Sequence, residues 1–242
     1  MCIRDSGKRG SELSAAWAGK VKSYQAQFPD LAKQLDLIKS RELPEGWDKD
    51  IPTFPADAKG LATRDSGGKV LNVLAKNVPW LMGGSADLYP STKTRLTFDG
   101  VGDFEPGHYG GRNFHFGIRE HSMCAIANGM SLSKIRPFAS SFFIFTDYCK
   151  PSIRLAALME VPVIFVFTHD SIGLGEDGPT HQPIEQLAAL RAVPNMIVLR
   201  PADANEVAEA YKVIMKQRNH PVMLVLTRQA VPTFDRTKYR CV

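Results

Sequence analysis

The sequence lacks the short patterns that mark the common phosphate-binding loops. It contains no P-loop pattern, and no GxGxxG segment passes from a strand directly into a helix. Gly173-Leu174-Gly175 instead leads into two acidic residues. These absences argue against a P-loop nucleotide site and against a dinucleotide-binding domain.

Cysteine pairs and long apolar runs are also scarce. No two of Cys2, Cys124, Cys149 and Cys241 have metal-ligand spacing, which predicts a reduced, cytoplasmic protein without a zinc site of its own. No apolar run approaches the roughly 18 residues that a membrane span needs. The first ten residues, MCIRDSGKRG, lack the apolar segment of a secretory signal. We therefore expect no membrane association.

The charge balance is mildly basic. The 242 residues carry a net charge of +5, with 44% hydrophobic and 23% charged residues. A solvated surface with slightly more cations than acids explains this charge, and so does affinity for small anions such as sugar phosphates. No cluster of lysine and arginine and no aromatic RNA-binding signature is present, so we expect no nucleic-acid partner.

The first sixty residues differ from the rest. Helical spacing over 13–27 and 30–42 is broken at Pro29 and stopped at Pro44. The prolines from Pro44 to Pro55 predict an extended linker. We therefore predict a helical arm and linker over residues 1–60, which packs against another surface because it has few large apolar side chains.

Beyond residue 60, strand and helix patterns alternate. Such alternation predicts an α/β fold, a mostly parallel sheet with helices on both faces. The predicted strands are 80–82, 136–139, 163–168, 196–199 and 222–226, and the predicted helices are 66–77, 120–132, 143–158, 184–191 and 204–218.

A polar loop follows the most apolar of these strands. Residues 171–183, SIGLGEDGPTHQP, follow the strand at 163–168, and few of their side chains could enter a core. Open α/β sheets bind ligands beyond the carboxyl ends of their strands, so this loop is the first candidate for a site.

Two further features allow a structural and a functional interpretation. Glu120 starts a predicted helix, where the helix dipole favours an acid, but a partly buried carboxylate there could also bind a ligand. Phe142, Phe143, Phe145 and Tyr148 could be core residues or a stacking wall for a flat heterocycle.

Several segments together resemble the pyrimidine-binding domain of transketolases, a thiamine-diphosphate-binding fold. The resemblance runs from about Lys8 to Phe234, which indicates a domain over 61–234 and a tail over 235–242 outside it. SADL at 85–88 and Ala-Thr-Arg at 62–64 favour transketolase over related thiamine enzymes. The segments are GGSADLYPS (83–91), FGIREH (116–121), THDSIGLGEDGPTHQP (168–183), RPADANE (200–206) and LTRQ (226–229).

The resemblance implies roles on the cofactor side of the site. Glu120 matches the carboxylate that stabilises the activated form of thiamine diphosphate. Phe142, Phe145 and Tyr148 match the aromatic wall for its pyrimidine ring, and Phe143 does not. Asp87 matches an acid near the cofactor or an interface.

It also implies a sugar-phosphate site for a ketol transferase of the pentose phosphate pathway. Arg64, Ser91, His169 and Arg228 match the phosphate contacts. Asp177 matches a residue that recognises a substrate hydroxyl, although Asp-Gly-Pro is also an ordinary turn. His181 matches a catalytic residue at the reacting part of the sugar, although it could be an ordinary loop histidine.

The departures from the family are informative. The Gly-Asp-Gly and Asn residues that hold the diphosphate and a divalent metal, Mg or Ca, are absent. Residues 1–7 and 240–242 do not continue the resemblance. We therefore expect the middle third of a transketolase, with no metal site and no activity alone. A homodimer partner or a diphosphate-binding domain would complete the site.

Alternatives remain open at this point. The chain could be a stand-alone pyrimidine-binding module of a split thiamine enzyme. It could instead belong to a dihydroxyacetone synthase, a deoxyxylulose-phosphate synthase or the β chain of a 2-oxo acid dehydrogenase.

Overall fold

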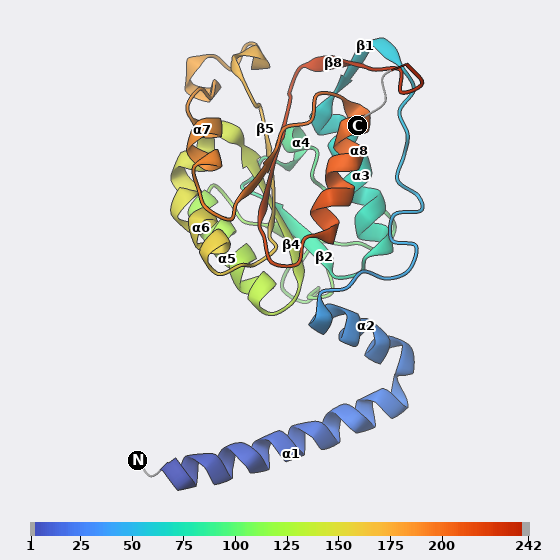
Figure 1. Ribbon diagram of the computed structural model, residues 1–242, viewed down its shortest axis with the longest axis vertical. Coiled ribbons are helices and arrows are strands. Elements are labelled where there is room, and N and C mark those ends of the chain that lie inside the picture. Colours follow the sequence, from blue (N-terminus) through green and yellow to red (C-terminus); the bar gives the residue numbers. More distant parts are fainter. Residues whose placement is uncertain (1–2, 239–242) are drawn as a thin grey trace. The chain divides into compact units, whose positions relative to one another are not determined.

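The computed structural model describes residues 3–238, and the chain divides into two compact units, Met1–Pro44 and Glu45–Val242. The first unit consists of α1 (Ile3–Gln27) and α2 (Pro29–Ser40) (Figure 1). Phe28 separates them in a non-helical conformation, because a residue before proline is disfavoured in the α region. The break therefore falls where Pro29 predicts it, and α1 begins earlier than its spacing indicates.

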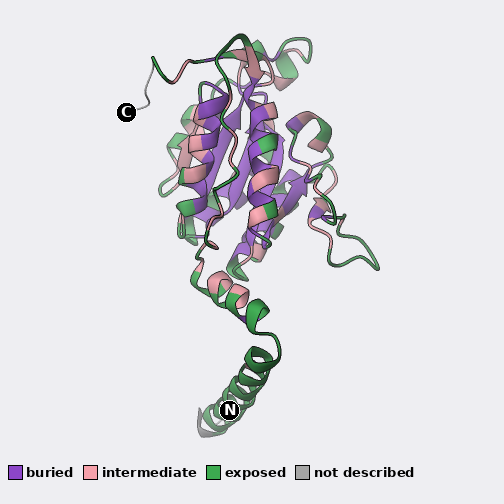
Figure 2. Cartoon of the chain, turned by 90° about the vertical axis from the view of Figure 1, so that its right-hand side faces the viewer, coloured by how far each residue is buried: buried purple, intermediate pink, exposed green. Residues whose placement is uncertain are grey.

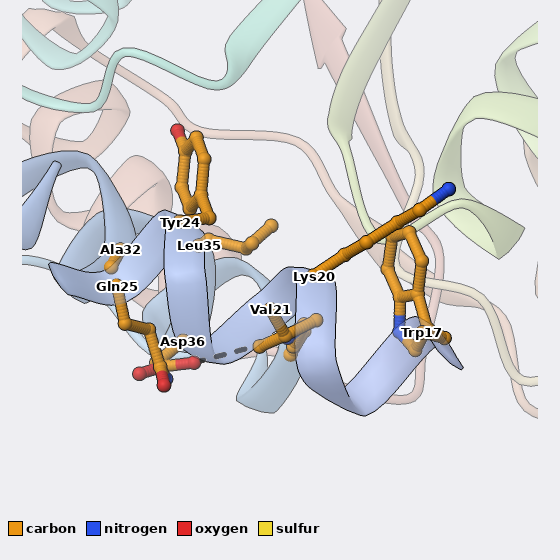
Figure 3. Close-up of a pocket in the computed structure, with 9 residues that line it drawn as sticks. Trp17, Lys20, Val21, Tyr24, Gln25, Ala32, Leu35 and Asp36 are labelled. Carbon is orange, nitrogen blue, oxygen red and sulfur yellow. Dashed lines mark ion pairs between the residues drawn. The ribbon is translucent and has the colours of Figure 1, made fainter. Parts of the chain in front are cut away.

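The two helices of this unit enclose an open apolar groove of about 300 Å³. Trp17, Val21 and Tyr24 of α1 and Ala32 and Leu35 of α2 line it (Figure 3). Ala32 is buried, but Trp17 is 64% exposed. Residues of α1 are exposed along almost its whole length (Figure 2). The helix pair thus buries little apolar surface by itself.

The larger unit is built on a six-stranded parallel sheet in the order β3-β2-β4-β5-β7-β6. This confirms the predicted α/β class. The central strands β5 and β7 are buried at every residue, as expected for a parallel sheet covered on both faces. The strands are β2 (Leu81–Ser85), β3 (Asn113–His115), β4 (Arg136–Phe142), β5 (Ile164–Thr168), β6 (Ile197–Leu199) and β7 (Val222–Leu226).

Helices cover both faces of this sheet, as predicted (Figure 1). On one face lie α5 (Glu120–Leu132), α6 (Thr146–Leu158) and α7 (Gln186–Arg191). On the other lie α3 (Thr63–Asn77) and α8 (Ala204–Lys216). Buried side chains of α5, α6 and the strands form one core that includes Cys124, Phe143 and Phe165. Figure 2 shows the buried residues concentrated in the sheet and on the inner faces of the helices.

A second, antiparallel sheet was not predicted from the sequence. It pairs β1 (Asp57–Ala62) with β8 (Ala230–Thr233), two segments without an apolar alternation. Gly60 has a φ of +71°, and a Cβ there would lie 1.8 Å from the carbonyl oxygen of Val231. The pairing therefore depends on a glycine and on a partner far along the chain, which local patterns do not reveal.

The prediction of one helix over 143–158 is wrong at its start. Strand β4 continues to Phe142, which pairs with Thr168 of β5, and Phe143–Phe145 form a 3₁₀ turn before α6. Pro151 lies inside α6 without ending it. The short helix α4 (Tyr89–Thr92) is not among the helices predicted from the sequence.

The segment before β1 is held against α8. The backbone N–H of Phe54 donates to the side-chain oxygen of Asn205, and the Asn205 amide donates back to the carbonyl of Phe54, both at 2.9 Å.

Within residues 3–238, no helix is long and apolar enough to cross a bilayer.

The N-cap of α8 provides a test of the fold. Asp203 is 2% exposed and accepts bonds from the backbone N–H groups of Glu206 (2.8 Å) and Phe234 (2.9 Å). Asp203→Ala removes the acceptor of both half-buried N–H groups, so we expect the free energy of unfolding to fall by about 0.5–2 kcal/mol, as for the loss of other helix N-caps. Urea denaturation measures it. Asp99→Ala, at an exposed residue, is the control, and an equal loss there would contradict this account.

Candidate functional site

The carboxyl ends of neighbouring parallel strands bring the predicted site residues to one edge of the sheet. Asp87 follows β2, His169 follows β5 and Arg228 follows β7. Phe142 is the last residue of β4, which lies between β2 and β5. Such an edge is where open α/β sheets bind ligands.

A pocket of about 490 Å³ opens at the start of α5. Glu120 is its deepest-set charged residue and is 8% exposed. Asp87, Ile118, Phe145 and Tyr148 line it too. The pocket thus combines apolar and aromatic walls with one largely buried carboxylate, and its geometry suits a flat ring that donates a hydrogen bond.

The aromatic residues form a continuous series from this pocket to the polar loop. Phe142 stacks on Phe145 with ring centroids 6.1 Å apart, and Phe145 lies 5.9 Å from Tyr148. Phe142 also lies 3.7 Å from the ring of His169, and His181 packs edge-on against Phe145 at 5.3 Å. Phe142 does not line the pocket itself, whereas Phe145 and Tyr148 do.

A cluster of charged side chains lies at the other end of this series. The Nε2 of His169 is 3.7 Å from the Oδ2 of Asp177, and the Nε of Arg228 is 3.6 Å from the same oxygen. Arg228 also pairs with Glu176. Arg64 donates to the backbone carbonyl of Ser91 at 3.0 Å. The cluster therefore holds two guanidinium groups, an imidazole and the carboxylates of Asp177 and Glu176.

The electrostatics of the cluster favour an anion. Burial, together with the positive charges of Arg64 and Arg228, lowers the pKa of His169 to about 4, and Asp177 opposes this shift. Burial also lowers the pKa of Arg64, and Arg228 adds to this effect. The Nε of Arg64 is buried and has no hydrogen-bond partner among residues 3–238. A bound anion would offset the repulsion between Arg64 and Arg228 and would accept a hydrogen bond from the Nε of Arg64.

Two threonines that the sequence did not single out fasten the cluster together. Thr63 and Thr227 exchange backbone-to-hydroxyl bonds of 2.9 and 2.7 Å, and the N–H of Arg64 donates to the carbonyl of Thr227. These bonds join the start of α3 to the end of β7. Each threonine precedes an arginine of the cluster, Arg64 or Arg228, and this adjacency is the only sequence signal for their role.

The described part of the chain offers no cluster of side chains for a metal ion. Within residues 3–238, no group of three or more His, Cys, Asp or Glu side chains is arranged to hold a metal ion. The site can therefore offer an apolar pocket with a carboxylate, and next to it a cationic cluster for an anion.

Known proteins match this chain over most of its length. Residues 59–233 match the family model described as "Transketolase, pyrimidine binding domain". The transketolase of Bacillus subtilis (strain 168) is 49% identical over 238 residues, which are 98% of this chain and 35% of that protein.

Solved structures give the same result. A transketolase from Pichia stipitis, determined with xylulose 5-phosphate, superimposes with a TM-score of 0.88 at 40% identity, covering 94% of this chain and 34% of that one. A structure described as a split gene transketolase, an inactive β4 tetramer, has a TM-score of 0.60 at 33% identity and covers 76% of this chain and 57% of that one.

The chain thus spans about a third of the length of the transketolases that it matches over nearly all of its own residues. Because the family model covers residues 59–233, which include the pocket and the charged cluster, this chain belongs to the transketolase family and contains its pyrimidine-binding domain.

Proposed function

We propose that this chain supplies the pyrimidine side of a thiamine-diphosphate site that transfers a two-carbon ketol unit between ketose and aldose phosphates. The observation that carries the proposal is the placement of Glu120, a largely buried carboxylate in a pocket walled by Phe145 and Tyr148. Its support is the family membership of the domain.

The residues of the pocket fit the cofactor. Thiamine diphosphate supplies a carbon nucleophile that can carry the ketol unit. Glu120 would hold a proton at a nitrogen of the pyrimidine ring, and Phe142, Phe145 and Tyr148 would form the wall against that ring. Asp87 would lie near the cofactor or contact a partner, since it lines the pocket and is exposed.

The charged cluster fits the phosphate of a sugar. Arg64 and Arg228 would donate charge-assisted hydrogen bonds to it, and Ser91 would add its hydroxyl. His169, neutral at pH 7 because its pKa is about 4, would donate a hydrogen bond without adding charge. Asp177 would recognise a sugar hydroxyl. His181, between the cluster and the aromatic wall, would act at the reacting carbons.

An uncharged surface beside the pocket supports a protein partner. No Asp, Glu, Lys or Arg occurs between Glu120 and Lys134. In the same stretch, α5 exposes the apolar side chains of Ile126 and Leu132. Ile118, which lines the pocket, is 80% exposed. Exposed apolar side chains in a stretch without these charges support contact with a protein partner. We propose that the diphosphate-binding domain, with its divalent metal, covers this face in a dimer.

A second candidate is a split enzyme, in which another chain carries the diphosphate-binding domain. The split gene transketolase that resembles this chain supports it. In both cases we propose a cytoplasmic protein. The support is that Cys124 and Cys149 are neighbouring but free, as expected in a reducing compartment.

Reconstitution tests the proposed function. The 242-residue chain alone should not convert xylulose 5-phosphate and ribose 5-phosphate with added thiamine diphosphate and Mg²⁺, because the cofactor's diphosphate has no binding domain. Adding a separately expressed transketolase diphosphate-binding domain should produce activity, measured by coupled assay. Turnover by the chain alone, or none with any partner domain that binds it, would contradict the proposal.

Glu120→Gln in the reconstituted enzyme tests the carboxylate. The amide keeps the size of the side chain but cannot stabilise a protonated ring, so kcat should fall by about 10²–10⁴-fold. Binding of ribose 5-phosphate should change little. Glu185→Gln, at an exposed residue, is the control. Unchanged turnover in Glu120→Gln would remove this residue from the cofactor site.

Arg228→Ala tests the phosphate cluster in the same enzyme. Loss of one charged contact should lower kcat/KM for phosphorylated substrates by a factor that corresponds to about 1.5–3 kcal/mol. Unphosphorylated analogues such as ribose should be much less affected. An equal loss for both kinds of substrate would assign Arg228 a structural role instead.

The buried imidazole predicts a pH dependence of stability. His169 protonates near pH 4 when folded and near 6.5 when unfolded, so the unfolded chain binds more protons in between. The free energy of unfolding should therefore fall by up to about 1.4 kcal/mol per unit as pH drops from about 6.5 toward 4, and His169→Gln should lose this component. His108→Gln, at a mostly exposed histidine, is the control. Parallel pH profiles for His169→Gln and the wild type would refute the assignment.

A further inference from the structure

The polar loop begins at an ion pair between the buried Asp170 and the exposed Arg200, and no proposed substrate contact involves this pair. Asp170 is 7% exposed, and its Oδ2 accepts hydrogen bonds from the Nε (2.9 Å) and Nη2 (2.7 Å) of Arg200. The hydroxyl of Ser171 donates to the other carboxylate oxygen at 3.3 Å. Arg200 directly follows β6, the edge strand of the sheet. The pair thus fixes the start of the loop to a different strand end from the one it leaves.

The residue before Asp170 has an unusual backbone conformation. His169 has a φ of +61°, in the left-handed region, which is unfavourable for a non-glycine residue. Such a conformation persists only where the surroundings enforce it. On one side, Thr168 is held in the sheet by its pairing with Phe142 and Leu226. On the other side, Asp170 is held by Arg200.

This backbone conformation sets the position of the imidazole. The His169 ring packs 3.7 Å from the ring of Phe142, and its Nε2 lies 3.7 Å from Asp177, within the charged cluster. If Asp170 were released, His169 could relax to a negative φ and its side chain would leave this position. Asp177, in the same loop, would lose one of its two charged or polar neighbours and keep Arg228.

The far end of the loop has its own attachment. The side-chain amide of Gln186 donates to the Oδ2 of Asp147 at 2.9 Å, and its oxygen accepts the N–H of Ile184 at 3.0 Å. Loss of Arg200 would therefore free only the beginning of the loop. The remaining attachment makes a local change more favourable than unfolding of the domain.

We propose that Arg200 is a positioning residue: through Asp170 it holds His169 in its left-handed conformation and so keeps the anion-binding cluster preformed. The identity of the anion as a sugar phosphate rests on the proposed function, whereas the coupling of Arg200 to His169 does not. Arg200 acts through Asp170 and does not itself touch the substrate.

The test uses the 242-residue chain and three variants. Arg200→Leu removes the pair, Arg200→Lys keeps one charge without the planar fork, and Arg191→Leu is the matched control at an exposed arginine that ends α7. Binding of inorganic phosphate and of ribose 5-phosphate is measured by NMR titration, with the histidine ring signals assigned.

Arg200→Leu should weaken binding of both probes by about fivefold or more, the lower range of coupling between two sites. It should also shift the ring signals of His169 before any ligand is added, and it should increase protease cleavage within residues 171–183. Arg200→Lys should restore part of the affinity, and Arg191→Leu should behave as the wild type.

A melting temperature lowered in Arg200→Leu with unchanged phosphate affinity and unchanged His169 signals would overturn the proposal, because the pair would then be structural only. If Arg200→Leu does not fold, Asp170→Asn, which keeps the size of the partner, must show the same shifts. If the wild type binds neither probe, the proposed phosphate site fails, but the His169 signals still decide the role of Arg200.

Discussion

The parallel pairing of β2, β4, β5 and β7 is the constraint on which the rest of the structure depends. Because these strands run in one direction, all their carboxyl ends meet at one edge of the sheet. Residues as distant in sequence as Asp87 and Arg228 are thereby brought to the same edge. The fully buried β5 and β7 make this arrangement rigid, since burial on both faces fixes their register.

The edge has two chemically different halves joined by aromatic rings. Glu120 lies in an apolar pocket, where a carboxylate interacts strongly with a hydrogen-bond donor. The guanidinium groups of Arg64 and Arg228 lie with the neutral imidazole of His169, and the repulsion between the two arginines and their burial favour an anion there. Phe142 touches the second half through His169 and the first through Phe145. We interpret this as one site for a ring-bearing cofactor and a phosphorylated substrate.

The domain exposes apolar surface beside the pocket. The pocket is bordered by Ile118 and Tyr148, which are 80% and 67% exposed, and α5 offers an uncharged outer face. Such surface is costly in water and favours a partner. In the first unit, the open apolar groove around Trp17 has the same character. The transketolases that this chain matches are about three times as long, so most of their length lies outside the part that it matches.

The sequence by itself determined the fold class, the family and the residues to inspect, because buried strands, strand-end loops and the SADL and GEDGPTH segments are local patterns. The tertiary structure decided what depends on distant contacts. It paired β1 with β8, ended β4 at Phe142 and separated Phe142 from the pocket that Phe145 lines. It also paired Asp170 with Arg200, thirty residues away, and Thr63 with Thr227. No local spacing encodes such pairs, since their energy comes from burial that exists only once the sheet has formed.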